Sequence, residues 1–178
     1  METIHLTTEL STPWVLWFHA IDGETYDVDS FERLADIRTV GDYLTVIGSI
    51  KNYTSGMFYL MRDGIPPMWE HEANREGGYW SYRIPKARAN NTWTDFCSAA
   101  VGNILTRNIA DMQWVNGISI SPKINNAILK IWVSVDNFPH NRLPENIGEF
   151  YLSGGVFKKA TEMLTQAVEA GTATSGSA

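Results

Sequence analysis

The sequence predicts an α+β fold in which an antiparallel sheet of about six or seven strands carries three helices on one face. Short apolar and aromatic runs are separated by brief polar turns, which is typical of strands joined by hairpins. Three other segments instead show apolar residues at helical spacing. Because the chain of 178 residues has no internal repeat and no linker, we expect one domain, 1–178, with a substantial core.

Strands are expected where aromatic, aliphatic and β-branched residues are bounded by turn residues. The run at 13–19 contains two Trp and one Phe and is typical of a strand at the centre of a sheet. The alternation at 29–37 is imperfect and indicates a weaker strand. A short polar turn at 122–126 separates the last two runs, which therefore predict a hairpin. The expected strands lie at 13–19, 29–37, 56–62, 79–84, 114–121 and 127–135.

Three helices are expected because apolar residues recur every three or four positions in three segments. The first spans 39–50, and either Thr39 or Asp42 provides its N-cap. The second spans 90–105 and begins with a run of capping residues, Asn-Asn-Thr. The third spans 156–168.

The composition limits the classes of function that fit this chain. A net charge of −6 argues against holding long RNA or DNA by its phosphates, although a pocket for one nucleotide remains compatible. The single Cys97 excludes an internal disulfide and a cysteine-based zinc site. Without a membrane-spanning run or a secretory signal, a cytoplasmic protein with no membrane partner is expected. The polar segments 1–12 and 171–178 are expected to be flexible tails.

The stretch 63–80 has the clearest functional pattern. It opens with a turn signal, Asp63-Gly64, and continues to Pro66-Pro67, whose fixed φ and missing N–H donors exclude a helix or a central strand. Trp69 and Glu70 follow directly, so a flat ring and a carboxylate are presented from a stiff loop. This pair suits a flat, partly cationic ligand. The alternative is that Trp69 fills the core and Glu70 is solvated.

This stretch also carries a resemblance to a known family. Residues 63–72 read Asp-Gly-Ile-Pro-Pro-Met-Trp-Glu-His-Glu and are followed by Asn74, Gly77-Gly78 and Trp80. Together they strongly resemble the signature of the mRNA cap-binding protein family, eukaryotic translation initiation factor 4E. Residues 14–18 resemble the first strand of that family, 39–42 the start of its first helix and 130–132 a late strand. The matches are collinear and span residues 13 to 134.

The resemblance implies a curved antiparallel sheet of about six to eight strands, shaped like a cupped hand, with three helices on its convex face. It also bears on the C-terminal part of the chain. Residues 172–177 resemble part of the C-terminal loop of the family. The family has a strand, however, where the apolar spacing at 156–168 predicts a helix.

The resemblance further implies that the concave side binds the 7-methylguanosine cap of mRNA in translation initiation, without catalysis or a cofactor. Tyr26 and Trp69 match the two rings that sandwich the methylated base, Glu70 matches the glutamate that pairs with guanine, and Trp132 matches the ring beside the methyl group. The chemistry agrees, because a methylated guanine is cationic and gains about 0.5–2 kcal/mol from each ring. A carboxylate fits the two N–H donors of guanine, which adenine lacks. Four further Trp residues are assigned to the core: Trp14, Trp17, Trp80 and Trp114.

The basic residues that hold the cap phosphates in the family are only partly present. Lys123 matches the first of them, whereas Asn125, Ile128 and Tyr79 replace three others without charge. We therefore expect weaker phosphate binding, or contacts of Asn125 and Ile128 with the nucleotide that follows the cap. Three other cations could bind phosphate, although solvated surface positions are the simpler interpretation: Lys86, Arg88 and Arg107.

The convex face departs further from the family, whose members bind a scaffold protein or repressors through a short helical peptide. Val40 matches one contact, but Leu44 stands at the position of a Trp. The contacts from the second helix fall on side chains too small to hold a peptide: Ser98, Ala99 and Gly102. Capped mRNA is thus the expected partner. One alternative is a cap-binding repressor or decoy that does not engage the usual scaffold protein.

Two other functions fit parts of the pattern. His71 with Glu70, Glu72 and Glu76 could form a metal site or a cap hydrolase, but a solvated acidic loop is the simpler interpretation. The HExxH spacing that places two ligands on one helix face is missing, so neither a metal nor an enzyme is expected. An aromatic cage for methyl-lysine is the other alternative, against which Glu70 argues.

Overall fold

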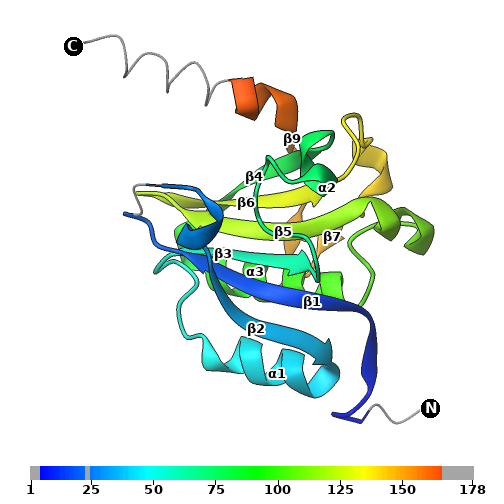
Figure 1. The fold of residues 1–178 in the computed structure, drawn as a ribbon. Helices are drawn as coiled ribbons and strands as arrows, with labels where there is room; N and C mark the ends of the chain where they lie inside the picture. Colours follow the sequence, from blue (N-terminus) through cyan, green and yellow to red (C-terminus); the bar gives the residue numbers. More distant parts are fainter. Residues whose placement is uncertain (1–4, 23–24, 166–178) are drawn as a thin grey trace.

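The computed structural model describes residues 5–22 and 25–165, which form an α+β fold as the sequence predicts. Within these residues, seven strands form one antiparallel sheet in the order β2-β1-β3-β5-β6-β4-β9 (Figure 1). Two short strands, β7 and β8, pair separately. The strands are β1 Glu9–His19, β2 Glu32–Thr39, β3 Met57–Arg62, β4 Gly78–Pro85, β5 Val115–Pro122, β6 Asn126–Val133, β7 Asn146–Ile147, β8 Phe150–Tyr151 and β9 Val156–Lys159.

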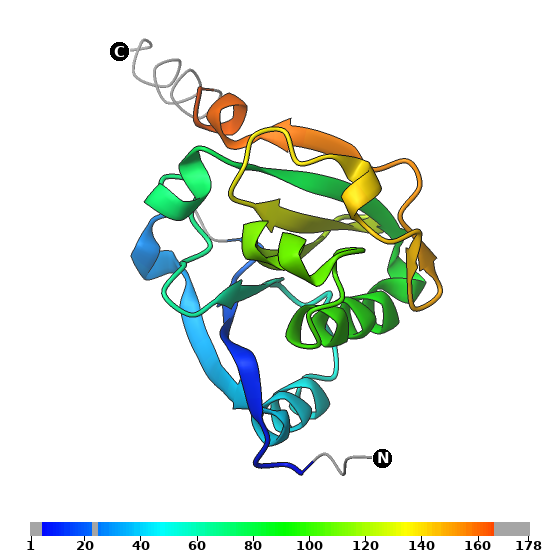
Figure 2. The ribbon, with the colours of Figure 1, turned by 90° about the vertical axis from the view of Figure 1, so that its right-hand side faces the viewer.

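The helices gather mainly on one side of this sheet. They are α1 Val40–Ser49, α2 Glu72–Arg75 and α3 Ala89–Val101, with a further helical segment at 160–165. Figure 2 shows α1 and α3 on the same side of the strands. In the ranges described, no helix combines the length and the apolar character needed to cross a membrane. Short 3-10 turns lie at Val28–Ser30, Lys86–Arg88, Ile109–Trp114 and His140–Arg142.

Alternation of side chains along the strands gives the sheet two different faces. Phe58 and Leu60 of β3 pack into the main core with α1 and α3. Tyr59 and Met61 point to the opposite face, where they form a second, smaller cluster with Trp132. This second face carries neither α1 nor α3, so a ligand can reach the sheet there. Of the four Trp residues predicted for the core, Trp14, Trp80 and Trp114 pack in the main core. Trp17 packs against the second cluster instead.

The first helix begins where the sequence predicts. Thr39 is the N-cap, and its side chain accepts a hydrogen bond of 3.1 Å from the Asp42 N–H. Asp42 accepts in return from the Thr39 N–H at 2.9 Å, which completes a capping box. Hydrogen bonds from the backbone of Arg38 and of Thr39 lower the pKa of Asp42.

The structure differs from two expectations, the N-terminal tail and the helix at 156–168. The polar segment 9–12 is part of β1, and Glu9 lies opposite Thr39 of β2, because strand pairing uses the backbone and does not need apolar side chains. The helix expected at 156–168 is wrong in its first turn, where β9 pairs with β4. Phe157 packs on Trp80 of β4 with ring centroids 5.4 Å apart, so this apolar side chain makes a contact between neighbouring strands and not a helix contact. The expected tail at 171–178 and the loop-like 172–177 lie outside the described residues.

The second predicted helix is shorter than expected. α3 ends at Val101, and its N-cap residue Arg88 makes no side-chain cap. The run at 90–92 lies inside the first turn, because a 3-10 turn leads directly into the helix. Leu105 is fully buried although it lies beyond the helix, whereas Ile104 is exposed. The sequence did not indicate α2, β7 or β8.

Candidate functional site

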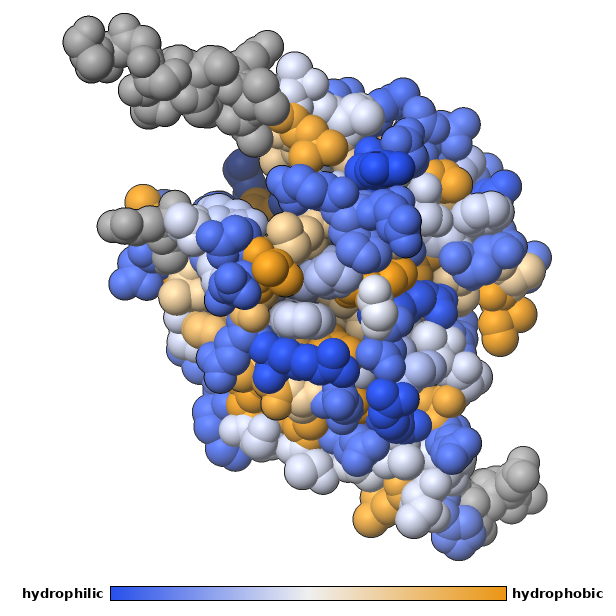
Figure 3. Space-filling view, viewed as in Figure 1, coloured by the Kyte–Doolittle hydropathy of each residue, from blue (hydrophilic) through white to orange (hydrophobic). Residues whose placement is uncertain are grey.

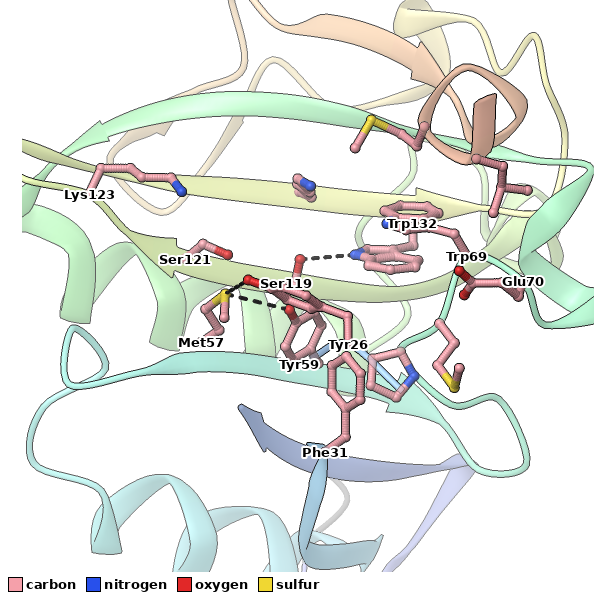
Figure 4. A pocket seen from close by; sticks show the side chains of 15 residues that line it. Tyr26, Phe31, Met57, Tyr59, Trp69, Glu70, Ser119, Ser121, Lys123 and Trp132 are labelled. Atoms are coloured by element: carbon pink, nitrogen blue, oxygen red, sulfur yellow. Dashed lines mark hydrogen bonds between the residues drawn. The ribbon is translucent and has the colours of Figure 1, made fainter. Parts of the chain in front are cut away.

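A cavity of about 340 Å³ opens on the face of the sheet that carries the second cluster. Its floor comes from β3, β5 and β6, and its rim from the connections between β1 and β2 and between β3 and α2 (Figure 4). Apolar side chains emerge among hydrophilic ones on this side of the molecule (Figure 3). The cavity is lined by all four residues predicted to contact the cap base and by the predicted phosphate contact: Tyr26, Trp69, Glu70, Trp132 and Lys123.

Two of these rings lie directly against each other. Trp69 stacks on Trp132 with ring centroids 3.5 Å apart and an interplanar angle of 1° (Figure 4). Trp132 is buried, and its Nε1 donates a hydrogen bond of 2.9 Å to Ser119 Oγ. At this separation no base fits between the two rings. Trp69 is therefore in a closed position, with Glu70 exposed beside it.

A buried polar network holds the loop that carries Trp69. Asn74 Nδ2 donates to the carbonyl oxygens of Pro66 at 3.1 Å and of Met68 at 2.8 Å. Asn74 Oδ1 accepts in turn from Asn116 Nδ2 at 2.9 Å, and both Asn side chains are buried. The backbone on the N-terminal side of Trp69 is thereby fixed to β5. Gly77, next to this network, has no room for a Cβ because the Val133 carbonyl oxygen occupies that space.

Tyr26 lies in the cavity wall in a different arrangement. Its ring stacks on His19 with centroids 4.5 Å apart and an interplanar angle of 4°. Its hydroxyl points to Met57 Sδ at 3.9 Å, and the residue is 58% exposed. His19 is itself buried, and its Nδ1 and Nε2 lie 2.7 Å and 2.8 Å from the carbonyl oxygens of Ala20 and Thr25, respectively. Tyr26 is thus supported from behind and presents a ring at the mouth of the cavity.

One cation in the cavity was missed in the sequence. Lys130 Nζ lies 4.2 Å from the ring centroid of Tyr79 and 5.5 Å from that of Trp69. Burial, together with the positive charges of Lys123 and Lys158, lowers the pKa of Lys130 to about 8. The alternation of β6 could have revealed it, because Lys130 stands two residues before Trp132 and so shares its face.

The predicted contacts of the second nucleotide and the alternative phosphate-binding cations do not line this cavity. Asn125 is exposed at the β5–β6 turn and Ile128 is half-buried in β6, and neither lines the cavity. Three other cations also lie outside the cavity. Arg88 forms an ion pair of 3.0 Å with Glu149, and Arg107 forms one of 3.5 Å with Glu145. Lys86 is exposed, so all three fit the interpretation as surface charges.

At the predicted partner surface between α1 and α3, Ser98 and Gly102 are exposed and a hydrogen bond joins the two helices. Tyr43 of α1 shares a hydrogen bond of 2.6 Å with Ser98 of α3. Ala99 is buried, whereas Leu44 is 50% exposed and Val40 is half-buried. Leu44 is thus the one of these apolar side chains that a partner meets first.

The acidic loop does not assemble a metal site. His71 is the N-cap of α2, where Nδ1 accepts from the Ala73 N–H at 3.2 Å. Glu70, Glu72 and Glu76 are all exposed. Across 5–22 and 25–165, no three His, Cys, Asp or Glu side chains are grouped so that they could hold a metal ion. His71 therefore has a structural role in this loop.

Known proteins share both sequence and fold with this chain. Residues 9–152 match the family model described as eukaryotic initiation factor 4E. The chain is 28% identical over 131 residues to eukaryotic translation initiation factor 4E of Dictyostelium discoideum, a match that covers 69% of this chain and 51% of that protein. It is 27% identical over 150 residues to the Xenopus laevis factor, with 80% and 68% covered. The chain thus spans about half the length of the Dictyostelium relative.

Two solved structures show the similarity of fold. Ascaris suum eIF4E-3 in complex with the m7G cap superimposes with a TM-score of 0.65 at 22% identity, over 73% of this chain and 75% of that one. Caenorhabditis elegans eIF4E-3 with the 4E-binding protein Mextli gives a TM-score of 0.75 at 18% identity, over 88% and 95%.

Proposed function

This chain belongs to the eukaryotic initiation factor 4E family, and we propose that it binds the 7-methylguanosine cap of mRNA and acts in translation initiation in the cytoplasm. One observation carries the proposal. Trp69 and Glu70 lie side by side at a cavity of about 340 Å³, on a loop that a buried network holds in place. This is the arrangement that a cationic purine with two N–H donors at its edge requires.

Cap binding on this geometry begins with an exchange of stacking partners. Trp69 leaves Trp132, and the base enters between Trp69 and Tyr26, with its methyl group toward Trp132. Separating the two Trp rings costs about 0.5–1.5 kcal/mol beyond the change in buried area. A neutral guanine replaces the stacking of Trp69 on Trp132 with a stacking contact of similar strength, so little free energy is gained. A methylated guanine adds about 0.5–2 kcal/mol of cation–π energy per ring, so the exchange favours the methylated form.

Glu70 supplies the second element of recognition. Its carboxylate accepts hydrogen bonds from N1–H and N2–H₂ of guanine, a pairing in which an ionised acceptor meets two donors. Adenine offers no such pair and would leave Glu70 without partners in the closed site, at a cost of about 1–3 kcal/mol. Trp69 therefore reads the charge of the base and Glu70 reads its identity. No step in this scheme breaks a bond, so the chain acts by binding alone.

The proposal predicts a specific optical titration. Adding 7-methyl-GTP quenches Trp fluorescence, because the base stacks on Trp69, and unmethylated GTP requires at least about tenfold more ligand for half-saturation. The ligand recovered afterwards is chemically unchanged, also with divalent metal present. Equal affinity for both nucleotides would remove the basis of the proposal, and cleavage of a capped RNA would move the protein to the hydrolases.

A second candidate is a cap-binding repressor or decoy, and it is favoured by the small side chains at the α3 contact positions, where Ser98 and Gly102 are exposed and Ala99 is buried. The Caenorhabditis relative is named as a complex with a 4E-binding protein. A pull-down with a helical scaffold peptide separates the two candidates. We expect weak binding that Leu44→Trp strengthens by about tenfold, because a Trp at an exposed contact position adds a large apolar anchor. Binding that Leu44→Trp leaves unchanged would place the partner elsewhere.

A further inference from the structure

Lys130 is a cation of the cavity that has no acidic partner among residues 5–22 and 25–165. Its ammonium group is largely enclosed by the rings of Tyr79 and Trp69, at 4.2 Å and 5.5 Å from their centroids. Among the ion pairs of the described residues, none includes Lys130. The charges that lie near it are also positive, on Lys123 of the β5–β6 turn and Lys158 of β9. Burying a cation next to two others is unfavourable unless an anion joins them.

The groups around Lys130 form a polar strip along the floor of the cavity. Lys130 lies opposite Ser119 in the β5–β6 ladder, and Ser121 follows on the same face of β5. Ser119 Oγ accepts from Trp132 Nε1, so its own O–H proton remains available to a ligand. The strip continues to Lys123 at the turn. Figure 4 shows Lys123 at the far end of the cavity from Trp132 and Glu70.

We propose that Lys130 binds the first phosphate of the cap nucleotide, with Ser119 and Ser121 as hydroxyl donors, and that Lys123 binds a later phosphate. This inference rests on the proposed function. Lys130 stands two residues from Trp132 on the same face of a strand, a step of about 6.6 Å, whereas Lys123 is at the other end of the strip. With the base at Trp69 and Trp132, the sugar and first phosphate reach Lys130 before any other cation of the strip.

The position of Lys130 also accounts for the charge missing elsewhere. Tyr79, which stands at a position that is basic in the family, faces Lys130 from the neighbouring strand and contacts its ammonium group through the ring. The cation is thus supplied by β6 instead of β4, and it lies deeper in the cavity than the exposed Lys123. A deeper cation acts over a shorter distance and in a lower dielectric, which strengthens its attraction to an anion.

The test is an affinity series with 7-methylguanosine and its mono-, di- and triphosphates, measured by calorimetry. In the wild type, the step from nucleoside to monophosphate raises affinity by about tenfold, the value of one charge-assisted contact. Lys130→Met removes this step and leaves nucleoside binding intact. Lys130→Arg retains part of it, and Lys123→Met reduces a later step. Lys86→Met, an exposed lysine outside the cavity, changes none of them.

The outcomes separate this inference from the proposed function. If Lys130→Met binds the nucleoside normally and keeps the full monophosphate step, Lys130 is not the phosphate contact and cap binding stands. If the wild type binds none of the four methylated ligands, both proposals fail. If Lys130→Met lowers the affinities for nucleoside and monophosphate equally, its role is structural and the inference is wrong. Because an unpaired buried cation is removed, the melting temperature of Lys130→Met should not fall.

The pH dependence gives an independent measurement on the unmodified chain. The pKa of Lys130 is about 8, so the ammonium form is lost as pH rises through that value. The monophosphate step is therefore largest below about pH 8 and declines above it. Using the difference between monophosphate and nucleoside cancels any ionisation of the base. If the gain in affinity from nucleoside to monophosphate stays constant from pH 7 to pH 9.5 at low ionic strength, where charges are weakly screened, Lys130 does not bind the phosphate.

Discussion

Trp69→Leu is expected to lower the affinity for 7-methyl-GTP by about a hundredfold. Base–aromatic stacking is worth about 1–3 kcal/mol per base, and the positive charge of the methylated base adds a cation–π contribution. A Leu side chain offers neither. Isothermal titration calorimetry is the suitable measurement, because the substitution removes one of the fluorophores that quenching would monitor. The fold should remain, since Trp69 packs against the small second cluster and the main core lies on the other face of the sheet.

Two further variants make this prediction specific. Trp69→Phe retains an aromatic face and should lose only part of the affinity. Trp80→Leu is a matched control, because Trp80 is also half-buried but packs against the main core and donates a hydrogen bond of 3.0 Å to the Phe138 carbonyl. It should lower stability and leave cap affinity unchanged. If Trp69→Leu and Trp80→Leu affected binding to the same extent, the loss would reflect general destabilisation instead of stacking.

The regular part of the fold follows from patterns within the sequence. The aromatic run at 13–19 lies in β1, and the residues that cap α1 stand beside its first turn. β9 could not be found in this way, because its four residues are too few to show a period of two. The start of β1 was missed for another reason. Residues 9–12 belong to β1, and Glu9 joins the sheet by pairing with Thr39 through the backbone, to which the polarity of the side chains gives no guide.

The site shows the same division between local pattern and tertiary arrangement. The motif around Trp69 and the strand position of Trp132 indicated residues that the structure brings to one cavity. Their direct stacking could not be predicted, because it depends on how a loop between β3 and α2 folds back over β6. Lys130 was readable from the alternation of β6 but does not stand at a basic position of the family. Asn74 was visible only as one letter of the motif.

Asn74→Ala is expected to lower the free energy of unfolding by about 2–3 kcal/mol and cap affinity by about tenfold. The substitution removes the donors that the carbonyl oxygens of Pro66 and Met68 accept from, and it leaves Asn116 Nδ2 with the Ala73 carbonyl alone. Buried polar groups that lose a partner cost about 1–3 kcal/mol. Affinity falls as well, because the freed loop must then be ordered again around Trp69 and Glu70 when ligand binds.

Asn74→Asp sharpens this expectation, because it keeps the shape of the side chain while placing a carboxylate oxygen against the two carbonyl oxygens. It should therefore be more destabilising than Asn74→Ala. Asn137→Ala, at an exposed Asn, should change stability by no more than about 0.5 kcal/mol. Urea unfolding and calorimetric titration of the same samples measure both effects. If Asn74→Ala changes neither stability nor affinity, the loop is held by its prolines alone. If Asn74→Ala loses affinity but keeps its full stability, the network orders the binding loop without supporting the core.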